Sequence, residues 1–281
     1  MKFILSIAAG AALIGPMSGR PAGVQPAVQP AADISGAPVL DGARRLFYNA
    51  KYEAAAALML DRCSSSADGV AACELRSAAL HFQIRRALGD SADKDKAWDR
   101  CAACPGLMAA FRRDVDRGQT LARARLRVQP DNEAMLFLLS KLSLNHVWLH
   151  LGTLGRKTGW REYWEARKTL DKLLKQNPSH VRARVARGWI DYIVDTKMPR
   201  GTRWLLGGGD KKKGLRAVWE AANAEADFFA NVEARFALWD MQVRERKLKE
   251  AVDTARGLAR DFPENSDLSR FLEAHDDSGA K

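Results

Sequence analysis

Residues 166–178 read ARKTLDKLLKQNP, and this stretch contains the pattern that decides the fold. Its apolar side chains at Ala166, Leu170 and Leu173 are spaced as on one face of an amphipathic α-helix. Pro178 closes the stretch, because the residue before a proline is pushed out of helical geometry. The stretch therefore predicts a helix that ends just before Pro178, with a small residue twelve positions earlier.

Two other stretches share this pattern. The phrases VQPDN at 128–132 and DFPEN at 261–265 resemble QNPSH at 176–180, and Gly118 and Ala251 stand twelve residues before their prolines. A small residue at this point lets one helix press closely on another. We therefore expect repeated helix pairs, in which a proline ends the second helix of each pair.

The rest of the chain is also helical in character. Strand-like alternation is scarce, Ala, Leu, Arg, Lys and Glu dominate, and Pro, Gly, Asn and Asp separate the apolar segments. The expected fold class is all-α, an array of antiparallel helix pairs. The helices are predicted at 40–50, 52–64, 69–88, 93–103, 106–128, 132–155, 160–176, 179–195, 211–226, 228–245, 248–261 and 265–274.

These features resemble the tetratricopeptide repeat (TPR), whose second helix carries small residues and ends at a proline. LFYNAKYEAA at 46–55 resembles the first helix, turn and second-helix entry of such a repeat, and 236–251 repeats the arrangement. The resemblance covers residues 39–275 and implies an α-solenoid. The repeats are degenerate, because the three prolines are 48 and 85 residues apart and an insertion lies near 196–210.

A second resemblance lies beside that insertion. WLLGGGDKKKG at 204–214 is similar to a turn in the periplasmic TPR subunits that accompany TRAP-type transporters. Glycine and lysine before a helix could also suggest a phosphate loop, but the Gly-Lys-Ser/Thr ending is missing. We interpret Gly207–Lys213 as a helix start with exposed lysines.

The N-terminus indicates export. Lys2 is followed by an apolar run over 3–14, as in a signal peptide, and the run is too short for a comfortable membrane anchor. We expect a signal peptide at 1–22, a flexible Pro/Ala-rich linker at 23–38 and a disordered tail at 276–281. No later segment is apolar enough to cross a membrane, so the expected location is extracytoplasmic, in a bacterial periplasm.

Four cysteines in an exported chain suggest disulfides. Cys63, Cys73, Cys101 and Cys104 allow three connectivities, and the sequence does not choose among them. Bridges that tie the short 93–103 helix to its neighbours would staple this poorly apolar part of the array. The alternatives are a redox Cys-x-x-Cys site at Cys101 and Cys104, or a zinc site built from all four.

The sequence contains no complete catalytic set. His146 and His150 lie four residues apart on one predicted helix, but no acidic residue separates them as in a metalloprotease. Nucleophile elbows, Walker loops and dinucleotide fingerprints are also missing from the sequence. We expect a binding protein without a cofactor. The alternative is an exported thiol-based oxidoreductase, or a metal-dependent enzyme that uses His146 and His150.

Aromatic and basic residues concentrate between 148 and 204. Such aromatics are usually core, but mixed with cations they also suit a groove that binds through stacking and ion pairing. We place the groove on the concave face of helices 132–155, 160–176 and 179–195, with the insertion as a cap and Arg200 and Arg203 exposed. The candidate residues are Trp148, Lys157, Trp160, Arg161, Tyr163, Trp164, Trp189, Tyr192, Arg200, Arg203 and Trp204.

The chain carries a formal net charge of +11, which suggests an anionic partner or simply well-solvated helix faces. A protein or peptide partner is expected, or a small anionic solute. Nucleic acid is not expected for an exported protein.

Overall fold

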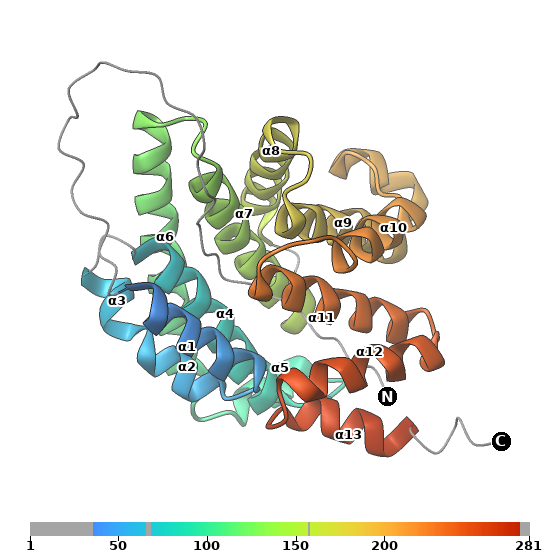
Figure 1. Cartoon of the computed structure of the whole chain (residues 1–281). Coiled ribbons are helices and arrows are strands. Elements are labelled where there is room, and N and C mark those ends of the chain that lie inside the picture. The colour runs from blue at the N-terminus through green and yellow to red at the C-terminus, as the bar shows by residue number, and fades with distance from the viewer. Residues whose placement is uncertain (1–35, 66–68, 157, 276–281) are drawn as a thin grey trace.

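A computed structural model describes residues 36–65, 69–156 and 158–275 of the chain (Figure 1). Within these ranges every regular element is a helix, which confirms the predicted all-helical class. The finer prediction, a TPR-like α-solenoid, stays a prediction. The elements are α1 (Gly36–Tyr48), α2 (Tyr52–Leu58), α3 (Leu60–Ser65), α4 (Gly69–Leu88), α5 (Lys94–Asp99), α6 (Cys104–Val128), α7 (Glu133–Val147), the π-helix η1 (Trp148–Thr153), α8 (Trp160–Gln176), α9 (Val181–Lys197), the 3-10 helix η2 (Arg200–Leu206), α10 (Lys211–Ala222), α11 (Phe228–Arg244), α12 (Leu248–Asp261) and α13 (Ser266–His275).

Neighbouring helices pack in pairs. The closest associations join α4 to α6, α7 to α8 and α9 to α10, and in addition α11 packs on α12 and α1 on α2. Successive pairs are connected because α6 packs on α7, α8 on α9 and α10 on α11. The core therefore runs along the array from pair to pair.

The three proline phrases form the same turn. Helices α6, α8 and α12 each end two residues before their proline. The residue two positions after the proline then caps the next helix in each case: the side chains of Asn132, His180 and Asn265 accept the N–H of Met135, Ala183 and Leu268 at 3.0, 3.1 and 3.1 Å. The predicted helix ends are thus confirmed, and one short phrase both stops a helix and starts the next.

The turn inside a pair also recurs. Between α1 and α2 the N–H of Lys51 donates to the carbonyl of Leu46 at 2.9 Å, and Ala50 has a positive φ of 59°. Between α11 and α12 the N–H of Lys247 donates to Gln242 at 2.9 Å, and Arg246 has a φ of 58°. The likeness between 46–55 and 236–251 therefore extends to the backbone.

The small residues before the prolines lie at close helix contacts. Ala166 and Ala251 are fully buried. A Cβ atom on Gly118 would come within 2.8 Å of Leu142 and 3.1 Å of Cys73. A larger side chain at these points has to push a neighbouring helix away.

We expect Ala166→Leu and Ala251→Leu each to destabilise the fold by about 1–3 kcal/mol, because overpacking forces a shift of a buried helix. Urea unfolding of the two variants measures the change. Ala109→Leu, at an exposed position of α6, is the control and should change stability by less than about 0.5 kcal/mol. Unchanged midpoints for both buried variants would contradict this packing.

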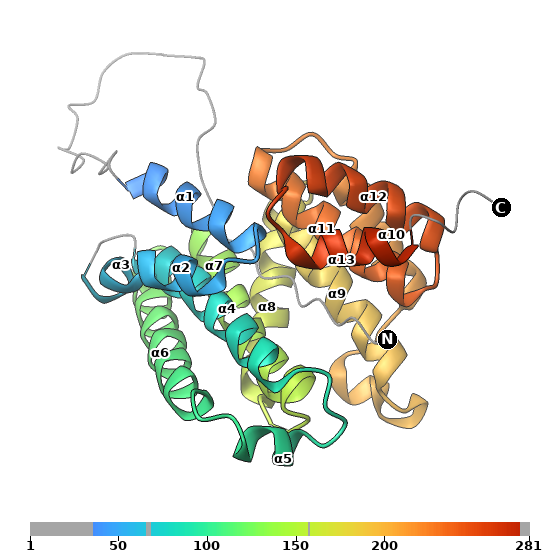
Figure 2. The same cartoon turned by 90° about the horizontal axis from the view of Figure 1, so that it is seen from below.

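The two ends of the helical array meet (Figure 2). The ring of Tyr48 in α1 stacks on Phe236 of α11 with centroids 5.2 Å apart, and it also contacts Phe262. The Asn265 side chain donates to the carbonyl of Tyr48 at 2.6 Å, and the N–H of Glu264 donates to Asn49 at 3.2 Å. The first helix is therefore packed between its own pair and the last helices of the chain.

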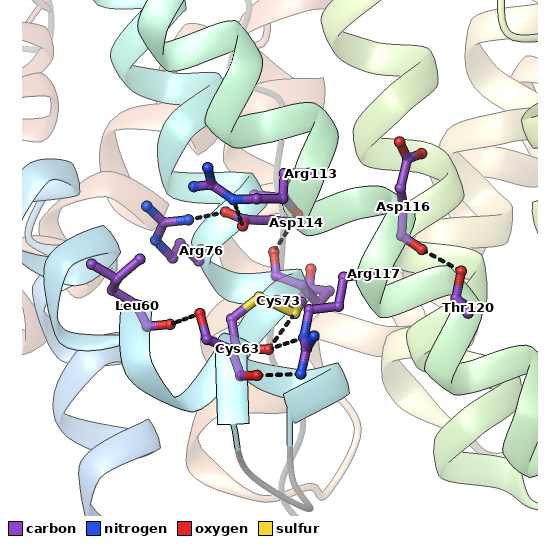
Figure 3. The surroundings of a disulfide bond; sticks show 12 residues. Leu60, Cys63, Cys73, Arg76, Arg113, Asp114, Asp116, Arg117 and Thr120 are labelled. Atoms are coloured by element: carbon purple, nitrogen blue, oxygen red, sulfur yellow. Dashed lines mark hydrogen bonds and ion pairs between the residues drawn. A yellow bond between two sulfur atoms is a disulfide. The ribbon is translucent and has the colours of Figure 1, made fainter.

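Both cysteine pairs are disulfides. Cys63–Cys73 joins α3 to α4, and Figure 3 shows Arg117 of α6 reaching the carbonyl of Cys63, to which it donates at 2.6 Å. Cys101–Cys104 closes the turn between α5 and α6. Of the three connectivities that the sequence left open, the structure has 63–73 and 101–104, so the second bridge is a local link between the end of α5 and the start of α6.

Several predicted boundaries are corrected. Residues 36–38 of the expected linker belong to α1, where Pro38 is tolerated because it lies in the first turn. The predicted helix 52–64 divides at Met59 into α2 and α3. The predicted helix 132–155 changes at Trp148 into the π-helix η1. The signal peptide, the rest of the linker and the tail lie outside the described residues.

Candidate functional site

A cavity of about 320 Å³ lies between α7, η1, α9 and α11. Its walls are mostly apolar, and two tryptophans contribute to them. This volume is at the lower end of the range for small-molecule sites. The lining residues are Lys141, Leu144, Trp148, Leu151, Gly152, Val185, Ala186, Trp189, Ile193, Lys197, Met198, Glu233 and Arg244.

The polar side of the cavity is a buried ion-pair network. Glu233 of α11 accepts from Lys141 of α7 at 3.0 Å and from Arg182 of α9 at 2.6 Å. All three side chains are buried. Burial raises the pKa of the Glu233 carboxyl, but Lys141 and Arg182 outweigh this effect and hold the pKa below its ordinary value. Glu233 is therefore ionised and joins three helices around the cavity.

A second cationic group flanks Trp189. The Arg244 guanidinium lies over the Trp189 ring at 5.3 Å, and Asp240 accepts from its Nε at 3.0 Å. The Trp189 indole N–H is buried and has no hydrogen-bond partner among the described residues. A buried donor without a partner is unfavourable for the fold.

The charge network continues inward from the cavity. Glu74 of α4 is fully buried, and neither carboxylate oxygen has a hydrogen-bond partner in the described part of the chain. Burial raises the pKa of Glu74 to about 7, against the opposing effects of Lys141 and Arg182. Burial also lowers the pKa of Arg44 in α1 to about 10, and Arg182 adds to this shift. The charges of Lys141 and Arg182 thus act on both buried carboxyl groups, Glu233 and Glu74.

The π-helix η1 shapes the cavity mouth. Its wider turn, in which the N–H of Leu154 donates to Leu149 at 3.0 Å, places Trp148, Leu151 and Gly152 on the cavity wall. Thr153, from the same element, instead pairs with His81 of α4 at 2.8 Å. Such π-helical segments are frequent at functional sites.

His81 and His150 are buried and neutral, and His146 of the same region is half-buried. Burial lowers the pKa of His81 to about 3 and that of His150 to about 4. The rings of His146 and His150 are 4.3 Å apart. Across the described residues, no group of three or more His, Cys, Asp or Glu side chains is placed to hold a metal ion.

The structure brings only part of the predicted groove together. Trp148 and Trp189 line the cavity. Tyr163 and Tyr192 are buried and donate to Leu206 and Glu245 at 2.7 and 2.8 Å, Trp164 is half-buried against the core, and Trp160 and Trp204 are exposed. The expected wall from helix 160–176 is therefore missing from the cavity, and α11 takes its place.

The predicted basic residues also differ in where the structure places them. Arg161 is exposed and pairs with Glu162 at 2.9 Å. Arg203 was expected to be exposed, but it is half-buried and pairs with Asp195. Lys157 and the Arg200 side chain lie outside the described residues. The cations of the cavity, Lys141, Lys197 and Arg244, were not among the predicted site residues.

The described helices include none that is long and apolar enough to span a membrane. Comparison of the chain with protein-family models, with curated proteins and with solved structures gave no match.

Proposed function

We propose that this chain is an exported, TPR-like binding protein that holds a small amphipathic anion in the cavity between α7, η1, α9 and α11. The repeated turns at the helix boundaries support the TPR-like assignment. The two disulfides and the apolar run near the N-terminus support export.

One observation carries the choice of ligand: the cavity combines apolar walls with an excess of cations. With the partners of the lining residues counted, four cations, Lys141, Arg182, Lys197 and Arg244, stand against two carboxylates, Glu233 and Asp240. An apolar chain would fill the space beside Trp148 and Trp189. An anionic end would then meet Arg244, and this arrangement favours a carboxylate with a hydrocarbon body.

Gly152→Phe is expected to weaken ligand binding at least about tenfold, or about 1.4 kcal/mol. Gly152 lines the cavity and a Cβ atom there meets nothing within 4 Å, so a phenyl group can occupy the mouth without disturbing the fold. Titration calorimetry of the full chain with decanoate measures the effect. Gly106→Phe, in equally open space on α6 and away from the cavity, should bind like the wild type. Equal affinities for both variants would refute this site.

The charge requirement is tested by the head group. Arg244→Met should weaken decanoate binding but leave decanol binding nearly unchanged, because only the carboxylate needs the guanidinium. If the wild type binds neither probe, a peptide or protein partner becomes the better hypothesis. If both probes bind equally well to the wild type, the cavity recognises only the hydrocarbon chain, and the proposal of an anionic ligand is wrong.

A further inference from the structure

Two exposed large apolar side chains lie next to each other in η2. Trp204 is 73% exposed and Leu205 is 52% exposed. The indole N–H of Trp204 donates to the carbonyl of Gly201 at 3.0 Å, so its polar edge is satisfied within the protein. What η2 presents to its surroundings is therefore apolar surface.

A third large side chain joins them from α8. Tyr163 and Arg167 of α8 donate to the carbonyl of Leu206 at 2.7 and 2.8 Å, which fixes the end of η2 on that helix. Trp160, one helical turn before Tyr163, is 51% exposed. Trp160 is therefore exposed on the helix that holds the end of η2.

Basic residues surround these apolar groups. Between residues 195 and 216 the sequence has seven Lys and Arg against two Asp. Both carboxylates are engaged: Asp195 pairs with Arg203 and accepts the N–H of Lys211 at 2.9 Å, and Asp210 caps α10. Lys197, Lys212 and Lys213 are exposed, and no described carboxylate pairs with them. We call Trp160, Trp204, Leu205 and these three lysines the η2 patch.

The η2 patch is held in shape by its own packing. Gly207 and Gly208 have positive φ values of 73° and 74°, and a Cβ atom on Gly209 would come within 2.6 Å of the Asp195 nitrogen. The segment between α9 and α10 forms an outer corner of the molecule in both views (Figures 1 and 2). A projecting corner that carries exposed apolar side chains and lysines suits shallow insertion into the interface of a bilayer.

We propose that the η2 patch docks the protein on an anionic lipid bilayer. Tryptophan and leucine side chains enter the boundary between head groups and acyl chains, and lysines attract the anionic head groups by about 1 kcal/mol each. Lys197 also lines the cavity, as does Met198 beside it. Docking therefore places the cavity mouth close to the lipid. The docking does not depend on which ligand the cavity holds.

Co-sedimentation of the full chain with vesicles tests the proposal. Phosphatidylcholine vesicles that contain phosphatidylglycerol should bind the protein, phosphatidylcholine vesicles alone should bind it much less, and added salt should weaken the binding. Trp204→Ser with Leu205→Ser should lower the affinity at least about tenfold. Trp219→Ser, at a tryptophan of α10 that is 57% exposed but outside the η2 patch, is the matched control and should bind normally.

A second double variant keeps the test valid if the first one does not fold. Lys212→Glu with Lys213→Glu changes only exposed side chains and should abolish the preference for anionic vesicles. The proposal is overturned if both double variants bind vesicles like the wild type, or if Trp219→Ser loses as much binding as they do. It is also overturned if the wild type does not bind anionic vesicles and the η2 patch binds a protein instead.

Discussion

Glu233→Ala is expected to destabilise the protein by about 3–5 kcal/mol, the largest effect of any single carboxylate described above. The substitution leaves Lys141 and Arg182 charged and only 3% and 4% exposed, with their shared partner removed. Both cations would then lose their shared carboxylate inside the core. Urea unfolding followed by circular dichroism at neutral pH measures the change.

Glu264→Ala provides the control for Glu233→Ala. Glu264 pairs with Lys51 where the first helices contact the last ones, but both side chains are about half exposed. Surface ion pairs contribute at most about 1 kcal/mol, so this variant should melt close to the wild type. Similar losses for the two variants would mean that burial of the Glu233 network is not what makes it important.

Gly214→Ala should cost about 3 kcal/mol or more, although it adds a single methyl group. A Cβ atom at this position would lie 2.5 Å from the carbonyl oxygen of Gly188 and 3.0 Å from the nitrogen of Tyr192. Both are backbone atoms of α9, so no side chain can rotate to make room. The helices α9 and α10 would have to separate. This would also disturb the cavity, because α9 supplies five of its lining residues, Val185, Ala186, Trp189, Ile193 and Lys197.

Gly106→Ala, the matched substitution on α6, should have the opposite sign. No atom lies within 4 Å of the Cβ position there, and replacing a helical glycine removes conformational freedom from the unfolded chain. We expect a gain of about 0.5–1 kcal/mol. Thermal unfolding of the two variants in parallel decides the matter, and equal melting temperatures would show that α9 and α10 tolerate separation.

The helix boundaries were predictable because their causes are local. A proline two residues past the helix end and a capping side chain two residues later act within five positions, as at 128–132 and 176–180. The change to a π-helix at Trp148 was not predictable in this way. The apolar pattern of 132–155 fits a continuous α-helix, and the wider turn depends on contacts with α4, such as that between Thr153 and His81.

The candidate site was only partly predictable. Trp148 and Trp189 stood out as aromatics, but the deciding charges come from residues 92 positions apart, Lys141 and Glu233. One signal was present: Lys141 interrupts the apolar run AMLFLLSKLSL at 134–144, and Glu233 lies in FFANVEARFALW at 228–239. A lone charge on an apolar helix face indicates a buried partner, yet periodicity cannot tell which distant helix supplies it.

The contact between α1 and the last helices has a consequence for how this protein can change its length. An open array can gain or lose a helix pair at either end by gene duplication or deletion. Here an added pair would separate Tyr48 from Phe236 and Asn265 and break the stacking that joins them. The contact between the first and last helices therefore fixes the number of helix pairs. Evolutionary variation in length should appear inside the array, at segments such as α5 and η2.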